Sequence, residues 1–153
     1  MRTMGIMPFN RILCAVDFSP ESIKAMSMAE SIVSNSPDCK LLIVYAFDLP
    51  AVPLPDYLTT VEGPSEIDEY MAKAQKLMNE HVERINREAG REISEGKIIT
   101  GKPVDTILKL IDTYNPDMVI MGNRKLGFKK GILLGSVSAR VSASSPVSVL
   151  IVR

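Results

Sequence analysis

Short runs of consecutive apolar residues alternate along this chain with longer segments in which apolar residues recur every three or four positions. An unbroken apolar run is typical of a strand buried on both faces, and the wider spacing is typical of a helix with one buried face. The predicted strands span residues 11–16, 41–47, 93–100, 118–121 and 147–152. The predicted helices begin near residues 19, 65, 103 and 135.

Strands and helices therefore follow one another in strict alternation through the chain. This order predicts an α/β fold of three layers, in which helices cover both faces of an open, five-stranded, mainly parallel sheet. We find no internal repeat and no second hydrophobic core, so we expect a single domain over residues 9–153. Residues 1–8 show no periodicity and are predicted to form a loose tail.

Capping and turn residues mark the ends of several predicted helices. Ser19 is a suitable N-cap for a helix that has Pro20 at its first position. Gly90 is predicted to end the longest helix, and Asn115 to end the next one, just before a proline. Residues 48–64 contain four prolines and are predicted to be irregular. The apolar stripe of the longest helix comprises Ile67, Met71, Ala74, Leu77, Met78, Val82 and Ile85.

Composition and charge limit the classes of function. The chain has 153 residues, 46% of them hydrophobic, and its 18 basic and 18 acidic residues balance. A neutral chain gives no electrostatic argument for a nucleic-acid or anionic-membrane partner. No stretch approaches the roughly 18 apolar residues of a membrane helix, and the first residues do not resemble a signal peptide. We therefore expect a cytoplasmic protein without a membrane partner.

Two strand ends carry residues suited to ligand binding, since parallel sheets bind ligands at the carboxyl ends of their strands. Asp17 follows the first strand, where it would accept hydrogen bonds from a ribose hydroxyl or an adenine amino group. The alternative for Asp17 is a capping or turn role. Gly122 follows the fourth strand, where the lack of a side chain lets a ligand approach the backbone closely.

The segment after Gly122 leads to a second helix start. Gly135 and Ser136 open a short helix, whose free N–H groups and positive dipole end favour a phosphate. The cations of this segment are Arg124, Lys125, Lys129 and Lys130. The alternative is a surface loop with solvated lysines. A P-loop is absent, because Gly127 is followed by Phe128 rather than by Lys and Ser or Thr, and the first strand is not followed by a dinucleotide-binding glycine fingerprint.

These segments resemble the universal stress protein family from about residue 9 to residue 153. The resemblance rests on residues 11–19, 116–122, 133–137 and 145–147. Its most specific part is the family's nucleotide signature, a glycine, two residues, a second glycine, nine residues, and then glycine with Ser or Thr. This chain keeps the spacing with Gly122 and Gly135-Ser136, but has Lys125 at the second glycine.

The resemblance implies a site for ATP, or for ADP or AMP, and the role of each residue in it. Ala15 and Val16 would flank the base, Asp17 would contact the adenosine and Ala46 would line the adenine slot. Met121 and Gly122 would border the path of the ribose and phosphates, beside Arg124 and Lys125. Gly135, Ser136 and Val137 would hold the phosphates. We expect no structural or catalytic metal, with Asp17 as the one candidate to share Mg²⁺ or Mn²⁺ with bound phosphates.

Three functions follow in order of preference. The first is a nucleotide-binding regulatory protein that is not primarily a catalyst. The second is a homodimer that has lost nucleotide binding because Lys125 replaces a glycine, and the third is a slow ATP hydrolase. The only histidine, His81, falls on the longest helix, and Cys14 falls inside a strand, so neither suits catalysis. In this family the apolar strand 147–152 would be an edge of the sheet, and it contains no proline or charge that would block pairing. This predicts a homodimer joined through the strand.

Overall fold

The computed structural model describes residues 9–48, 66–123 and 135–153. Strands and helices alternate through them in the predicted order. The elements are β1 (Arg11–Ala15), α1 (Pro20–Ser34), β2 (Lys40–Phe47), α2 (Glu66–Ala89), β3 (Ser94–Thr100), α3 (Pro103–Tyr114), β4 (Met118–Gly122), α4 (Ser136–Ser144) and β5 (Ser148–Val152).

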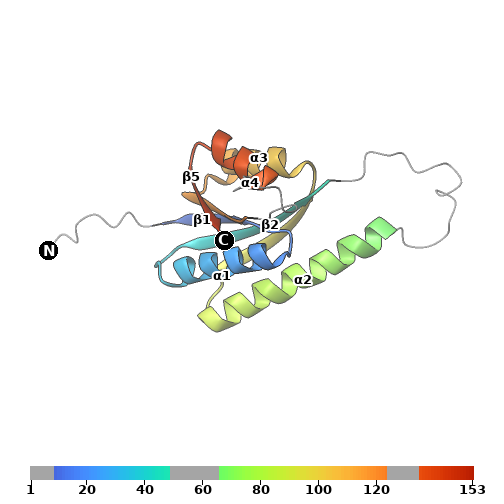
Figure 1. Ribbon diagram of the computed structural model, residues 1–153. Helices are drawn as coiled ribbons and strands as arrows, with labels where there is room; N and C mark the ends of the chain where they lie inside the picture. The colour runs from blue at the N-terminus through green and yellow to red at the C-terminus, as the bar shows by residue number, and fades with distance from the viewer. Residues whose placement is uncertain (1–8, 49–65, 124–134) are drawn as a thin grey trace, which may run out of the picture.

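The strands form one sheet in the order β3-β2-β1-β4-β5, and every neighbouring pair is parallel. Helices α1 and α2 cover one face of the sheet, and α3 and α4 cover the other (Figure 1). The predicted three-layer α/β fold is confirmed. Because the chain leaves β1 toward β2 on one side and later returns to place β4 on the other, the strand order reverses beside β1, where such sheets bind ligands.

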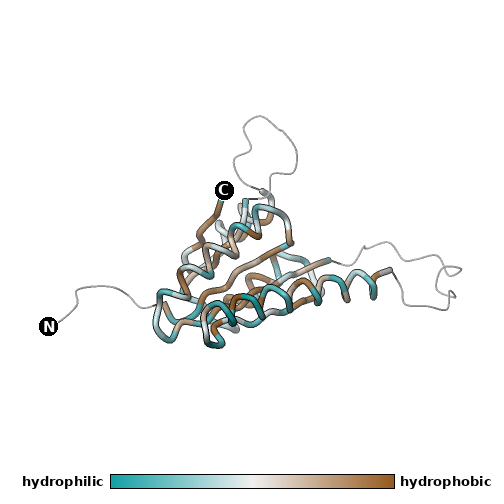
Figure 2. The backbone as a smooth tube through the Cα atoms, turned by 90° about the horizontal axis from the view of Figure 1, so that it is seen from below, coloured by the Kyte–Doolittle hydropathy of each residue, from teal (hydrophilic) through white to brown (hydrophobic). Residues whose placement is uncertain are grey.

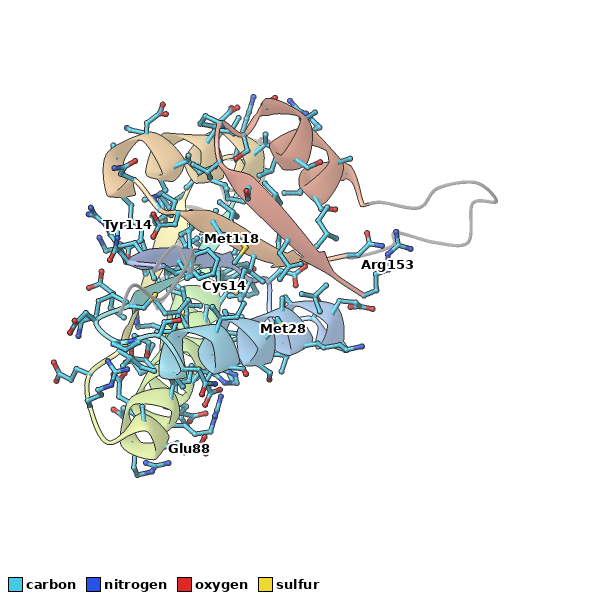
Figure 3. All side chains as sticks on the ribbon, turned by 90° about the vertical axis from the view of Figure 1, so that its left-hand side faces the viewer. Cys14, Met28, Glu88, Tyr114, Met118 and Arg153 are labelled. Carbon is cyan, nitrogen blue, oxygen red and sulfur yellow. The ribbon has the colours of Figure 1, made fainter. Side chains whose placement is uncertain are left out.

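Side chains that alternate along the strands fill two separate layers of core. Ile12 and Cys14 of β1 pack with α1 and α2, whereas Leu13 and Ala15 pack with α3 and α4. In Figure 2, brown, hydrophobic residues run through the middle of the molecule along most of the strands, and teal, hydrophilic residues recur along the helices. Cys14 is fully buried at the level of the sheet, while Glu88 lies on the surface of α2 (Figure 3). Cys14 and Cys39 form no disulfide.

Most of the predicted helix boundaries are confirmed. The Ser19 side chain caps α1 by accepting a hydrogen bond from the N–H of Ser22, and Pro20 is the first helical residue. Gly90 follows α2 with φ 69°, and Asn115 caps α3 with φ 53°, both in the left-handed region that ends helices.

The predicted apolar stripe is wrong at one residue. Leu77 of α2 is 42% exposed, whereas Ala74, Met78 and Ile85 are buried. The reason is that α2 packs mainly on β3, an edge strand, so only a narrow stripe of the helix is covered. Met78 lies so close to β3 that a Cβ on Gly96 would approach its Cγ to 2.4 Å.

Candidate functional site

A pocket of about 420 Å³ lies at the carboxyl ends of β1, β2 and β4, where the strand order reverses. Four helices contribute to it, α1, α2 and α3 near their first turns and α4 at its start. The pocket is lined by Ala15, Val16, Asp17, Ser22, Val44, Tyr45, Ala46, Phe47, Asp48, Tyr70, Pro103, Ile107, Met121, Gly122, Gly135, Ser136, Val137 and Ser138.

The structure brings the sequence-predicted site residues together in this one pocket. Its lining includes Ala15, Val16, Asp17, Ala46, Met121, Gly122, Gly135, Ser136 and Val137. The remaining two predicted residues, Arg124 and Lys125, lie outside the described part of the chain. Residues from four separate segments therefore converge at the place that the strand order favours for a ligand.

A tight turn after β1 sets the position of Asp17. Its Oδ1 accepts a hydrogen bond of 3.0 Å from the N–H of Ser19, and its own N–H donates to the Ser22 hydroxyl at 3.2 Å. Ser22 is buried and also donates this hydroxyl to the carbonyl oxygen of Ser19. Asp17 thus has the turn role that was its alternative, and it lines the pocket as well.

Phe18 occupies an unusual backbone conformation within that turn. Its φ of 61° lies in the left-handed region, which costs energy for a bulky residue and recurs at functional sites. Its ring packs edge-on against Tyr45 at 5.3 Å between centroids and stacks on His81 at 6.1 Å. These contacts hold the turn, and with it Asp17, against β2 and α2.

Gly122 has a packing role that the sequence did not reveal. A Cβ at this position would lie 2.5 Å from the backbone carbonyl carbon of Glu21 and 2.7 Å from the nitrogen of Ser22. The first turn of α1 therefore approaches β4 too closely for any side chain at Gly122. Glycine here serves helix packing next to the pocket, whether or not a ligand also uses the space.

The start of α4 offers hydrogen-bond donors that no described residue uses. Gly135 is the N-cap and its own N–H donates to the Oδ1 of buried Asn123 at 2.9 Å. In the described part of the chain, no partner accepts from the N–H groups of residues 136–138, and the exposed Ser136 hydroxyl makes no hydrogen bond. The donors left for an anion are therefore these three N–H groups and the Ser136 hydroxyl rather than the N–H of Gly135.

Part of the pocket wall consists of residues that the sequence did not single out. Val44, Pro103 and Ile107 add to its apolar side, and Tyr45, Phe47 and Tyr70 form an aromatic side. The alternation of Tyr45 and Phe47 with Ala46 was a usable signal, because neighbouring residues at a strand tip flank the same pocket from opposite faces. Tyr70 gave no such signal, since it comes close to the site only through tertiary folding. Asn123 directly follows Gly122 in the sequence, but its hydrogen bond to Gly135 forms only when β4 and α4 pack together.

The charged groups of the described lining are the carboxylates Asp17 and Asp48, with no Lys, Arg or His among these residues. His81 is outside the pocket, and burial lowers its pKa, with Arg84 lowering it further. Burial raises the pKa of the Cys14 thiol to about 12, so this thiol stays protonated at neutral pH. In the described residues no three acidic, His or Cys side chains gather as a metal site, and no helix there is long and apolar enough to cross a membrane.

The arrangement suits a ligand with an apolar ring system, a polar middle and an anionic end. The apolar side accepts the rings, the Asp17 carboxylate faces hydroxyl or amino donors, and the start of α4 faces the anion. No described residue of the lining combines a nucleophile with an adjacent histidine or lysine base.

Comparison with known proteins identifies the relatives of this chain. The family model described as "Universal stress protein family" matches residues 8–153. A universal stress protein of Thermus aquaticus is 30% identical over 149 residues, which cover 95% of this chain and 99% of the relative. A universal stress protein of Mycobacterium tuberculosis is 32% identical over 151 residues, which cover 94% of this chain and 96% of the relative.

Solved structures of such proteins have the same fold. The universal stress protein UspA of Lactobacillus plantarum superposes with a TM-score of 0.78 at 21% identity, over 95% of this chain and 99% of that one. A universal stress protein crystallised in complex with cAMP superposes with a TM-score of 0.70 at 26% identity, over 95% of this chain and 97% of that one.

Proposed function

Since the chain belongs to the universal stress protein family, we propose that its pocket binds an adenine nucleotide and that binding serves regulation rather than catalysis. The observation that carries the proposal is the convergence of nine sequence-predicted residues on a single pocket at the reversal of strand order. A relative in complex with cAMP supports the class of ligand.

The proposed ligand lies across three strand tips. Its base occupies the apolar side near Ala15 and Ala46, and its ribose lies beside Asp17. Its phosphates meet the N–H groups and hydroxyl at the start of α4, which also carries the positive end of the helix dipole. The pocket volume of about 420 Å³ falls within the range of small-molecule sites, roughly 300–1,000 Å³.

The described lining holds no cation, so the proposal also requires a source of positive charge for the phosphates. Two carboxylates line the pocket, and a triphosphate brings further negative charge. Either Mg²⁺ or Mn²⁺ accompanies ATP, or the side chains of Arg124 and Lys125 neutralise it. Titration of ATP and AMP with and without Mg²⁺ separates these two cases, because only the first makes ATP affinity depend on the metal.

Analysis of nucleotide that copurifies with the protein, followed by titration, tests nucleotide binding itself. The purified protein is heat-denatured and extracted with acid, and the extract is analysed for adenine nucleotides by chromatography. The ligand-free protein is then titrated with AMP, cAMP, ADP and ATP by calorimetry. If no nucleotide is released on denaturation and none of the added nucleotides binds, the alternative is favoured, a universal stress protein that assembles without a ligand.

A further inference from the structure

Three aromatic rings form the end of the pocket next to β2. The ring centroids of Phe47 and Tyr70 are 5.3 Å apart, and those of Tyr45 and Phe47 are 6.1 Å apart. The hydroxyl groups of Tyr45 and Tyr70 are hydrogen-bonded to each other. Tyr45 is 8% exposed and Tyr70 is 46% exposed, so a buried tyrosine holds a surface tyrosine in place.

Among the described side chains of α2, Tyr70 is the one that lines the pocket. Helix α2 is packed on β3 through Ala74, Met78 and Ile85, which lie farther along the helix. Burial of α2 therefore does not require a large ring at the position of Tyr70. Leu77 lies on the same helix and is about as exposed as Tyr70, but it does not line the pocket.

The rings and the start of α4 lie on opposite sides of Asp17. Strand β1 separates β2 from β4 in the sheet, and neighbouring strands are about 4.8 Å apart, so the tips of β2 and β4 are roughly 10 Å apart. Tyr45 and Phe47 belong to the β2 side, whereas Gly122 and the α4 start belong to the β4 side. A nucleotide with its phosphates at α4 thus presents its nucleoside, not its phosphates, to the aromatic rings.

We propose that Tyr70 is a ligand-positioning residue, whose ring bounds the nucleoside end of the pocket and whose hydroxyl bond to Tyr45 fixes that ring. The inference rests on the proposed nucleotide site and adds α2 to it. Aromatic rings contribute through contact area and preferred ring geometry, which a base or ribose can use and a phosphate cannot. The contribution of Tyr70 to binding is therefore the same for nucleotides that differ only in phosphate number.

The test is calorimetric titration of AMP, ADP and ATP into the full chain and its variants. We expect Tyr70→Ala to lower the affinity for all three nucleotides by a common factor of about ten. Leu77→Ala is the matched control, a similarly exposed side chain of the same helix outside the pocket, and it should leave all three affinities unchanged. Melting curves without ligand show whether each variant is folded.

Phenylalanine variants separate the ring from the hydroxyl. Tyr70→Phe and Tyr45→Phe each remove one partner of the same hydrogen bond, so the double variant should bind no more weakly than the weaker single variant. This non-additivity would support the positioning role, and additive losses would overturn it.

Three further outcomes would contradict the role of Tyr70 or the proposed function. Wild-type binding with equal affinities for Tyr70→Ala and Leu77→Ala would overturn this inference alone, as would a loss that grows with phosphate number. Failure of the wild-type protein to bind any of the three nucleotides would overturn the proposed function, and the inference with it.

Discussion

The side-chain oxygen of Asn123 accepts a hydrogen bond of 2.9 Å from the backbone N–H of Gly135. Asn123 directly follows β4, and its own N–H donates to the carbonyl oxygen of Val152 in β5. One buried side chain thus joins the end of β4 to the start of α4, although the two residues are 12 apart in the sequence. The direction in which α4 presents its first N–H groups depends on this bond.

Replacing Asn123 should destabilise the protein and weaken phosphate binding. Asn123→Ala leaves the buried N–H of Gly135 without its acceptor, which costs about 1–3 kcal/mol of unfolding free energy. Urea unfolding measures this loss, with Asn35→Ala as the control, because Asn35 is exposed and its side chain bonds only locally to Ser31. Equal stability of the two variants would contradict the structural role of Asn123.

Two substitutions of Asp17 should separate its turn role from ligand binding. Asp17→Asn keeps an oxygen that can accept from the Ser19 N–H but removes the charge, so stability should be nearly unchanged while nucleotide affinity falls by about 1–3 kcal/mol. Asp17→Ala should lose the affinity and also about 0.5–1.5 kcal/mol of stability. Calorimetric titration and thermal unfolding give the two quantities. If both variants bind as wild type does, Asp17 is only a turn residue.

A methyl group at Gly122 should be poorly tolerated. Gly122→Ala places a Cβ within 2.5–2.7 Å of the backbone of Glu21 and Ser22, so α1 must move away from β4. Such overpacking costs about 1–3 kcal/mol of stability, which thermal or urea unfolding measures. Because the turn that positions Asp17 leads into α1 and the N–H of Asp17 bonds to Ser22 of that helix, nucleotide affinity should fall as well. A variant as stable as wild type would mean that α1 can shift without cost.

The β5 edge should mediate a homodimer. The two edge strands differ, because β3 carries exposed Glu95 and Lys97, whereas β5 has no charge between Ser148 and Val152. An uncharged apolar edge favours pairing with a second copy. Light scattering at micromolar concentration should show a dimer that Val149→Lys dissociates, with circular dichroism confirming that the variant is folded. Lys97→Ala on the opposite edge is the control, and a wild-type monomer would refute the prediction.

Substitution of Lys125, which lies outside the described residues, tests the departure from the family's glycine signature. If this position requires a positive φ, lysine costs about 1–2 kcal/mol relative to glycine. Its charge offsets this, since an ammonium 4 Å from a phosphate gains about 4 kcal/mol at an effective dielectric of 20, before desolvation. We expect moderate, salt-dependent ATP binding, and Lys125→Gly should leave affinity equal or higher with weaker salt dependence.

The opposite result for Lys125 has a clear meaning. If the wild-type protein shows no ATP binding at millimolar nucleotide and Lys125→Gly restores it, the lysine blocks the phosphate path. The alternative of a nucleotide-free homodimer would then replace the proposed function.

The sequence by itself determined the alternation of strands and helices, because buried strands and amphipathic helices leave distinct local patterns of apolar residues. It also located the helix start at Ser19 and the helix ends at Gly90 and Asn115, since capping depends on residues within one turn. The glycines and Asp17 at the strand ends were found in the same way, and the family signature pointed to their common site.

Only the tertiary structure decided which residues surround that site. Asn123 and Gly135 meet because β4 and α4 pack together, and Tyr70 reaches the pocket because α2 lies against the β3 edge. The clash that excludes a side chain at Gly122 comes from the backbone of α1, about a hundred residues earlier in the chain. Such contacts depend on how whole elements are placed, and no local pattern of residue types encodes the distance between two backbones.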